Sequence, residues 1–441
     1  MVFNFFRYHV LFCALFFSVV SFAQSKNGIF SLDEAIEIGM NNNKIIQISS
    51  INETIAHTKE KDLKMEKLPD IDFKTGFKVL GNIRQFENGF FNPATKYEVP
   101  REQYNFTLSA EIPIYLGGRL KNDELKAEIE TEISELKTKK TGKDLRLQIV
   151  TGYLQVRHIE DQQELLREKM HEDSVNIHHI DALRKNGVVT NNEVLRAKLQ
   201  LSNHKMAYTE LDNQIAIVEH QIKTLISFPE HEEFHVTTQG LISDTELLGF
   251  EEQLVEEAYE KNEALEIAKK DIHIKNIEKK IVRANQLPII TGGGEYGYNY
   301  PNFMFFPPVA HLYRFGAIGF SVKVPLFNFY KNREKMAIAS EKINIAKLEV
   351  EEKEEQIRND VYRATRLYQE AIEKIEIAKE AMEQAKENYR IVKLKYANQL
   401  SLITELIDAD NAYLEAESQM ISLQINKQLK YYQLQYILGN L

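Results

Sequence analysis

A heptad repeat runs through residues 357–396 and constrains the fold more than any other feature of the sequence. Small or apolar residues recur at alternating spacings of four and three, and every second one between 364 and 385 is alanine. This seam predicts a left-handed coiled coil whose helices approach closely at the alanines. The stretch 331–438 contains neither glycine nor proline, so we expect helices far longer than those of ordinary globular domains. The seam positions are Ile357, Val361, Ala364, Tyr368, Ala371, Ile375, Ala378, Met382, Ala385, Tyr389, Val392 and Tyr396.

The same unit occurs a second time, 212 residues earlier. Positions 145–184 keep the phase of the seam with mostly apolar or small residues, and residues 187–197 align with 399–409 at the same offset. The beginnings of the two halves align at an offset of 219, which pairs Pro69 with Pro288. We therefore expect an internal duplication in which each half contains a helix, two strands and long helices.

Four segments alternate apolar and polar residues with a period of two, as half-buried strands do. They cover residues 71–79, 104–112, 290–300 and 318–324. Two soluble hairpins would explain the alternation alone. A transmembrane β-barrel is favoured because the segments are about 10 residues long, their apolar faces are rich in Phe and Tyr, and polar, aromatic loops join them. Four strands cannot close a barrel, which needs about eight, and an open edge is excluded from lipid. Several chains must therefore share one barrel.

The N-terminus predicts a secretory signal peptide over residues 1–23, with an apolar core and small residues before Gln24. The single cysteine, Cys13, lies inside that signal, so the mature chain is expected to have no disulfide. The net charge of −10 gives no support to nucleic-acid binding.

The signal, the duplicated helix–hairpin–helix plan, the prolines that close each hairpin (Pro113 and Pro325) and the Asn-rich start at residues 39–46 resemble the TolC-like outer-membrane efflux proteins. The resemblance covers essentially the whole mature chain. It implies an α+β membrane protein: a trimeric 12-stranded transmembrane β-barrel with four strands per chain, continued by a long coiled-coil α-helical barrel in the periplasm. We expect the first repeat at 24–226, with a helix at 31–68, a β-hairpin at 70–113 and long helices at 119–226. An equatorial linker at 227–249 precedes the second repeat at 250–441, with a helix at 251–287, a β-hairpin at 289–325 and long helices at 331–438.

The resemblance also implies a function and its partners. The chain would be the outer-membrane channel of a tripartite efflux or type I secretion system, a passive duct in the outer-membrane lipid. A periplasmic adaptor and an inner-membrane transporter of the RND or ABC type would open it after docking at the helix turns of Gly187 and Gln399. The family closes its periplasmic entrance with an acidic ring, and Glu405 and Asp408 fall where the two ring carboxylates would be. Tyr396 falls where the family has a gating tyrosine. Glu405 and Asp408 lie three residues apart on one side of a helical turn, and Ser401 stands where the family has a basic residue.

Other signals favour less specific interpretations. His171, His178, His179 and His204 have no recognised metal-ligand spacing, and we expect solvated histidines. The glycine-rich stretch 291–297 lacks a phosphate-binding signature, and no catalytic arrangement stands out. We predict a protein that is not an enzyme and needs no cofactor. Two alternatives stay open, a periplasmic adaptor and a structural coiled-coil protein of the cell envelope. The adaptor would need only one helical hairpin, and the coiled-coil protein would leave the aromatic strands unexplained.

Overall fold

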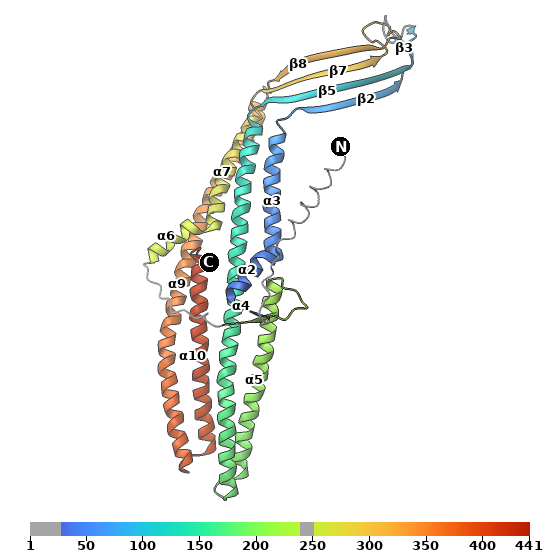
Figure 1. Ribbon diagram of the computed structural model, residues 1–441. Helices are drawn as coiled ribbons and strands as arrows, with labels where there is room; N and C mark the ends of the chain where they lie inside the picture. The colour runs from blue at the N-terminus through green and yellow to red at the C-terminus, as the bar shows by residue number, and fades with distance from the viewer. Residues whose placement is uncertain (1–27, 239–250) are drawn as a thin grey trace, which may run out of the picture.

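The computed structural model describes residues 28–238 and 251–441. The molecule is elongated, with a four-stranded sheet at one end and long helices running from it to the other end (Figure 1). The predicted signal peptide, residues 1–23, and residues 239–249 of the predicted linker lie outside the described residues.

The two repeats have the same order of elements. The first contains α2 (Leu32–Asn42), α3 (Lys44–Met65), β2 (Asp70–Val79), β5 (Glu102–Leu116), α4 (Arg119–Lys185) and α5 (Asn191–Leu225). The second contains α6 (Glu251–Lys261), α7 (Glu263–Ala284), β7 (Ile289–Tyr300), β8 (Tyr313–Lys323), α9 (Arg333–Ala397) and α10 (Ile403–Ile437). Shorter elements are β1 (Ile29–Phe30), β3 (Ile83–Gln85), β4 (Thr95–Tyr97), β6 (His235–Val236) and α8 (Asn328–Lys331).

The expectation of one helix at 31–68 and one at 251–287 is wrong, because each range contains two helices. The breaks fall at Asn43 and Asn262, which are 219 residues apart and therefore equivalent in the two repeats. Each asparagine has extended backbone angles, and its side-chain oxygen accepts hydrogen bonds from the amides two and three residues further on. Such N-caps satisfy the free amides of the following helix and change the chain direction.

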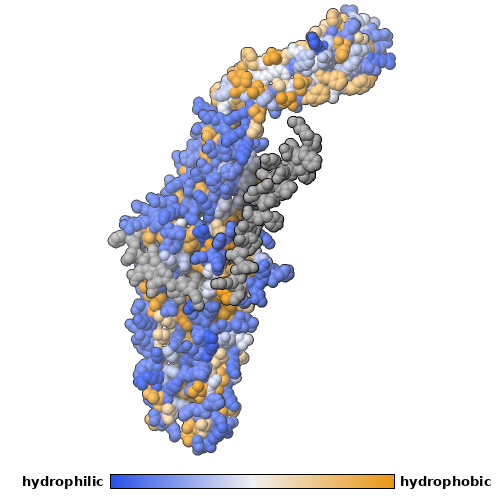
Figure 2. All heavy atoms as spheres, viewed as in Figure 1, coloured by the Kyte–Doolittle hydropathy of each residue, from blue (hydrophilic) through white to orange (hydrophobic). Residues whose placement is uncertain are grey.

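The sheet has the strand order β2-β5-β7-β8, with every neighbouring pair antiparallel. The central pair joins the two repeats, with Tyr104 opposite Tyr300. Among the described residues, β2 and β8 are paired on one side only. The apolar side chains of the sheet are largely exposed, and Figure 2 shows apolar residues over much of its surface. They include Ile71, Phe73, Phe77, Val79, Ile318 and Phe320, each at least 64% exposed.

The helices next to the sheet repeat the order of the strands. α3 contacts α4, α4 contacts α7, and α7 contacts α9. The corresponding strands are β2, β5, β7 and β8, so α3 and α9 lie at the two edges of this helical layer, as β2 and β8 do in the sheet (Figure 1). No helix within the described ranges has an apolar stretch long enough to cross a bilayer.

The seam of α9 supplies much of the core. Eight of its predicted positions are buried: Ile357, Val361, Ala364, Tyr368, Ala371, Ala378, Tyr389 and Tyr396. Farther from the sheet, α4 packs with α5 and α9 packs with α10, and α4 also contacts α10. Within the first repeat and the segment that follows it, β1 pairs in parallel with β6, and Phe30 joins Ile149 and Tyr153 in a second core.

Candidate functional site

The end of the molecule farthest from the sheet is formed by two helix turns, α4 to α5 and α9 to α10 (Figure 1). Both long helices end in the same Schellman motif. Gly187 (φ +73°) and Gln399 (φ +60°) have left-handed backbone conformations. The next amide donates to the carbonyl five residues earlier, at 3.0 Å in the first turn and 2.8 Å in the second. Glutamine is strained in this conformation, whereas glycine is not.

These two turns expose apolar side chains. Leu400 is 77% exposed, Leu402 is 67% exposed and Val188 is 43% exposed. Beside the turns, the two helical hairpins share one core, to which Ile180, Val194 and Ala197 contribute from the first repeat and Tyr396, Ile403 and Leu406 from the second. The helix turns of both repeats are therefore held together at the end of the molecule that lies farthest from the sheet.

Two seam tyrosines of α9 donate hydrogen bonds to carboxylates of the first repeat. The Tyr389 hydroxyl lies 2.7 Å from Glu172 Oε1 on α4, and the Tyr396 hydroxyl lies 3.0 Å from Glu193 Oε2 on α5. Burial raises the pKa of both phenols, and the neighbouring acids raise it further. Both tyrosines therefore stay protonated and remain hydrogen-bond donors. The predicted gating residue Tyr396 bonds an acid of the other repeat.

A buried ion pair links α4 to α10. Lys169 Nζ lies 2.8 Å from Asp410 Oδ1, and the two residues are 5% and 7% exposed. The ammonium also lies over the rings of Tyr389 and Tyr413, 5.0 Å and 4.8 Å from their centroids. Burial opposes the charge of Lys169, but the hydrogen bond and charge of Asp410 outweigh it and raise the pKa of the lysine. Burial raises the pKa of the Asp410 carboxyl, which Lys169 partly counteracts.

Glu172 connects this pair to α9. Its carboxylate lies 3.4 Å from Lys169 and pairs with Lys393 of α9 in addition to Tyr389. Burial would raise the pKa of Glu172, but the bonds from Lys393 and Tyr389 prevail and lower it below its usual value. Glu172 is therefore a carboxylate near neutral pH, bridging α4 to α9.

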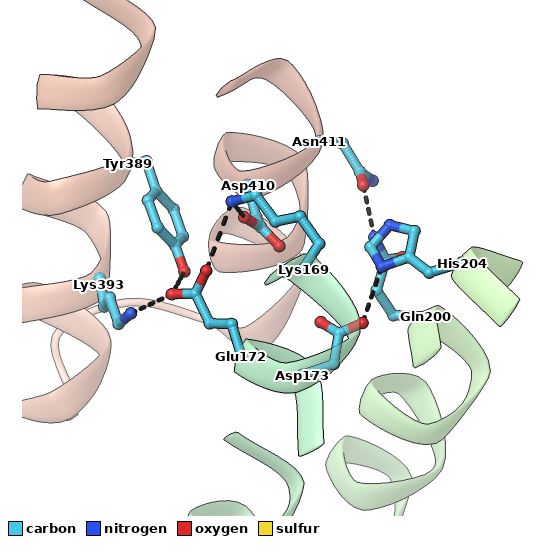
Figure 3. A network of polar contacts seen from close by, with 9 residues as sticks. All are labelled: Lys169, Glu172, Asp173, Gln200, His204, Tyr389, Lys393, Asp410 and Asn411. Atoms are coloured by element: carbon cyan, nitrogen blue, oxygen red, sulfur yellow. Dashed lines mark hydrogen bonds and ion pairs between the residues drawn. The ribbon is translucent and has the colours of Figure 1, made fainter. Parts of the chain in front are cut away.

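A second buried pair joins α4 to α5 in the same region (Figure 3). His204 Nδ1 lies 2.8 Å from Asp173 Oδ2, and both residues are 6% exposed. The other ring nitrogen contacts Gln200, whose amide donates to Asn411 of α10 at 2.5 Å. We call the nine residues drawn in Figure 3 the interhelix network; they are Lys169, Glu172, Asp173, Gln200, His204, Tyr389, Lys393, Asp410 and Asn411. The network connects α4, α5, α9 and α10.

The expectation that His204 is a solvated histidine is wrong, because its ring packs between α5 and α4 against a buried carboxylate. His171, His178 and His179 are exposed, as expected.

The predicted ring acids lie at the surface. Glu405 and Asp408 are exposed on the first turns of α10. Glu405 accepts a hydrogen bond from the Ser401 hydroxyl at 2.6 Å, so Ser401, which stands where the family has a basic residue, contacts one of the two predicted ring acids. Neither acid belongs to the interhelix network, and the structure brings Tyr396 to Glu193 rather than to these two acids.

Lys169, Glu172 and Asp410 are site residues that no sequence pattern indicates. Lys169 bonds Asp410 and Glu172 bonds Tyr389 across more than 200 residues of sequence, a separation at which no spacing can reveal a contact. One signal was present: Asp173 occupies an apolar seam position in the first repeat. A charged side chain in a coiled-coil seam needs a buried partner.

Comparison with known proteins agrees with this architecture. The family model described as outer membrane efflux protein matches residues 66–227 and 254–440. The solved structure of CusC superposes with a TM-score of 0.77 at 14% identity and covers 94% of this chain and 93% of its own. The outer-membrane channel OprN superposes with a TM-score of 0.75 at 16% identity, covering 93% of this chain and 90% of its own. The open state of the MtrE outer-membrane channel of Neisseria gonorrhoeae superposes with a TM-score of 0.74 at 18% identity, covering 92% of this chain and 88% of its own. No curated protein sequence matches the chain.

These findings confirm the resemblance stated from the sequence and the predicted fold class, that of outer-membrane channels with four barrel strands per chain and long coiled-coil helices. They also confirm the outer membrane as its location. Since the family model matches most of the chain, the chain belongs to the outer membrane efflux protein family.

Proposed function

We propose that three copies of this chain form a passive exit duct through the outer membrane and the periplasm, opened by a periplasmic adaptor and an inner-membrane pump. The main support for the proposal is that the sheet and the helical layer beside it are open at the same two edges. β2 and α3 lie at one edge, and β8 and α9 lie at the other. Pairing β2 of one chain with β8 of the next would satisfy the free backbone groups, as lipid requires. Three chains would then close twelve strands.

The edge helices carry exposed apolar stripes that fit the same closure. On α3, Ile45, Ile48, Ile51 and Ile55 are 58–61% exposed. On α9, Ile338, Ile345 and Leu348 are 55–63% exposed, at a spacing that places them on one helical face. Burying one such side chain contributes about 1.5–3 kcal/mol. The α3 stripe of one copy against the α9 stripe of the next would therefore stabilise a helical ring below the barrel.

The interhelix network and the Tyr396–Glu193 bond support a closed entrance in which α9 and α10 are held against α4 and α5. Opening would separate the Tyr389–Glu172, Lys393–Glu172 and Lys169–Asp410 contacts, and packed helices have discrete alternative arrangements. We assign Glu405, Asp408 and Tyr396 to the entrance. Three copies would place six exposed carboxylates of α10 around it and favour the passage of cations.

The exposed turns at Gly187 and Gln399 are the proposed docking points of the adaptor. Leu400 and Leu402 lie next to Gln399, and Val188 lies next to Gly187. Apolar side chains at the end of a helical hairpin are suited to a hydrophobic contact with a partner hairpin.

Two experiments test the proposal. The protein should remain with outer membranes after a carbonate wash and migrate as a trimer before boiling; a monomer that is soluble without detergent contradicts it. In planar bilayers, Glu405→Ala and Asp408→Ala together should reduce cation selectivity, whereas the charge-preserving double variant Glu405→Asp with Asp408→Glu, the matched control, should keep it. Unchanged selectivity in the double variant would remove these two acids from the entrance.

A further inference from the structure

We propose that α3 and α4 hold a divalent first-row transition-metal ion, of the Zn²⁺ type, between Glu53, His57 and Glu135. The ligand atoms of these three residues lie within 4.8 Å of one another. His57 Nε2 is 3.5 Å from Glu135 Oε1. One imidazole nitrogen and two carboxylates form a donor set that such ions accept.

The helices place these donors on facing surfaces. Glu53 and His57 are four residues apart on α3, so they occupy the same face one turn apart. Glu135 projects from α4, which packs along α3. A single ion would therefore join two helices rather than two residues of one helix.

The charges along this helix pair point to a cation at the same place. Elsewhere on the α3–α4 contact the acids have lysine partners: Lys59 lies 2.6 Å from Glu130, and Lys67 lies 2.5 Å from Glu124. Among the described residues, no lysine or arginine lies within ion-pair distance of Glu53 or Glu135. Two carboxylates thus converge on one imidazole with no lysine or arginine to pair with them, an arrangement whose negative charge a bound dication would balance.

The proposed metal site is accessible to solvent and does not overlap the face of α3 that the proposed trimer would bury. The His57 and Glu135 side chains are 46% and 44% exposed. At about 100° per residue, His57 and Glu53 lie on the opposite side of α3 from Ile48 and Ile55. An ion would therefore enter from solvent while the isoleucine stripe faces a neighbouring copy. Bound there, it would hold α3 against α4, and the stabilisation would grow with the logarithm of the ion concentration above its dissociation constant.

The first test is Zn²⁺ titration by calorimetry of the full-length protein in detergent, purified with a tag that contains no histidine. We expect one Zn²⁺ per chain, and at least about a tenfold loss of affinity in His57→Ala and in Glu135→Gln. His273→Ala removes an exposed helical histidine outside the site and should bind as the wild type does. Absence of Zn²⁺ binding to the wild type, or unchanged binding in His57→Ala, overturns the proposal.

The second test asks whether the ion joins the two helices. Zn²⁺ should slow amide hydrogen exchange in both α3 and α4 of the wild type and leave exchange in His57→Ala unchanged. Electron paramagnetic resonance of bound Cu²⁺ should show a single coordinating nitrogen that is lost in His57→Ala. Slower exchange at α3 alone, or two or more coordinating nitrogens, contradicts a site shared by His57 and the two glutamates.

Discussion

Replacing Lys169 with methionine tests whether the buried ion pair holds the two helical hairpins together. Methionine preserves most of the side-chain volume but leaves Asp410 buried at 7% exposure without its ammonium. Removing one partner of a buried pair costs about 3–5 kcal/mol. Here the contacts of the ammonium with the rings of Tyr389 and Tyr413 are lost as well, each about 0.5–2 kcal/mol. The lower ends of these ranges together amount to about 4 kcal/mol. We therefore expect the contact between α4 and α10 to open at least several hundredfold more often, since about 1.4 kcal/mol is a factor of ten.

Hydrogen exchange measured by mass spectrometry is the appropriate assay, because it reports local opening. The chain has no tryptophan, so intrinsic tryptophan fluorescence cannot follow unfolding. In Lys169→Met, exchange should accelerate in α4 and α10 near the interhelix network and stay unchanged in β2, β5, β7 and β8. The control is Lys185→Met, since Lys185 pairs with Asp181 at the surface of the same helix and such pairs contribute at most about 1 kcal/mol.

The double variant Lys169→Met with Asp410→Leu separates loss of the pair from burial of an unpaired charge. An apolar replacement of both partners is often neutral or stabilising, so the double variant should exchange more slowly than Lys169→Met. Equal rates in Lys169→Met and Lys185→Met would refute the reasoning, because the pair would then contribute no more than a surface contact.

Three further predictions concern the same end of the molecule. Gln399→Gly should raise the free energy of unfolding by about 0.5–1 kcal/mol by relieving a left-handed glutamine, measured by thermal unfolding followed by circular dichroism, and Gly187→Gln should lower it. The pKa of Glu172 in the folded protein is lowered from 4.5. The stabilisation that its carboxylate provides is therefore complete above pH 4.5 and is lost as the pH falls through the lower folded pKa. Channel conductance should rise below about pH 4.5, and Glu172→Gln should abolish this pH dependence. Tyr389→Phe removes the hydrogen bond to the Glu172 carboxylate, and bonds to charged groups contribute about 1.5–3 kcal/mol. The open probability of single channels should therefore increase. An unchanged open probability would contradict a role of this bond in closing the entrance.

The sequence predicted features that depend on local periodicity. The heptad seam of α9 is buried at Val361, Tyr368 and Ala371, and the strands lie within a few residues of the alternating segments. Side chains that repeat every 3.5 or every two residues must share a face whatever the rest of the chain does. The helix breaks at Asn43 and Asn262 depend on single capping side chains rather than on periodicity. The apolar pattern continues across each break, so periodicity alone does not locate it.

Features that depend on contacts between the repeats could not be predicted. The Lys169–Asp410 pair joins residues 241 positions apart, and in a chain with 55 Lys and Arg and 65 Asp and Glu no pairing of this kind can be inferred from spacing. The assignment of Glu405 and Asp408 to the entrance stays a prediction. Their exposure on α10 is compatible with that role.

The duplicated plan of this chain has a consequence for its symmetry. Three copies would arrange six similar hairpins around one axis, but alternate hairpins would differ: one kind turns at a glycine and the other at a strained glutamine. Any substitution in one repeat would thus alter every second position of the ring and leave the positions between unchanged. Substitutions in one repeat can thereby make three alternate hairpins of the ring mobile while the other three hairpins keep their positions.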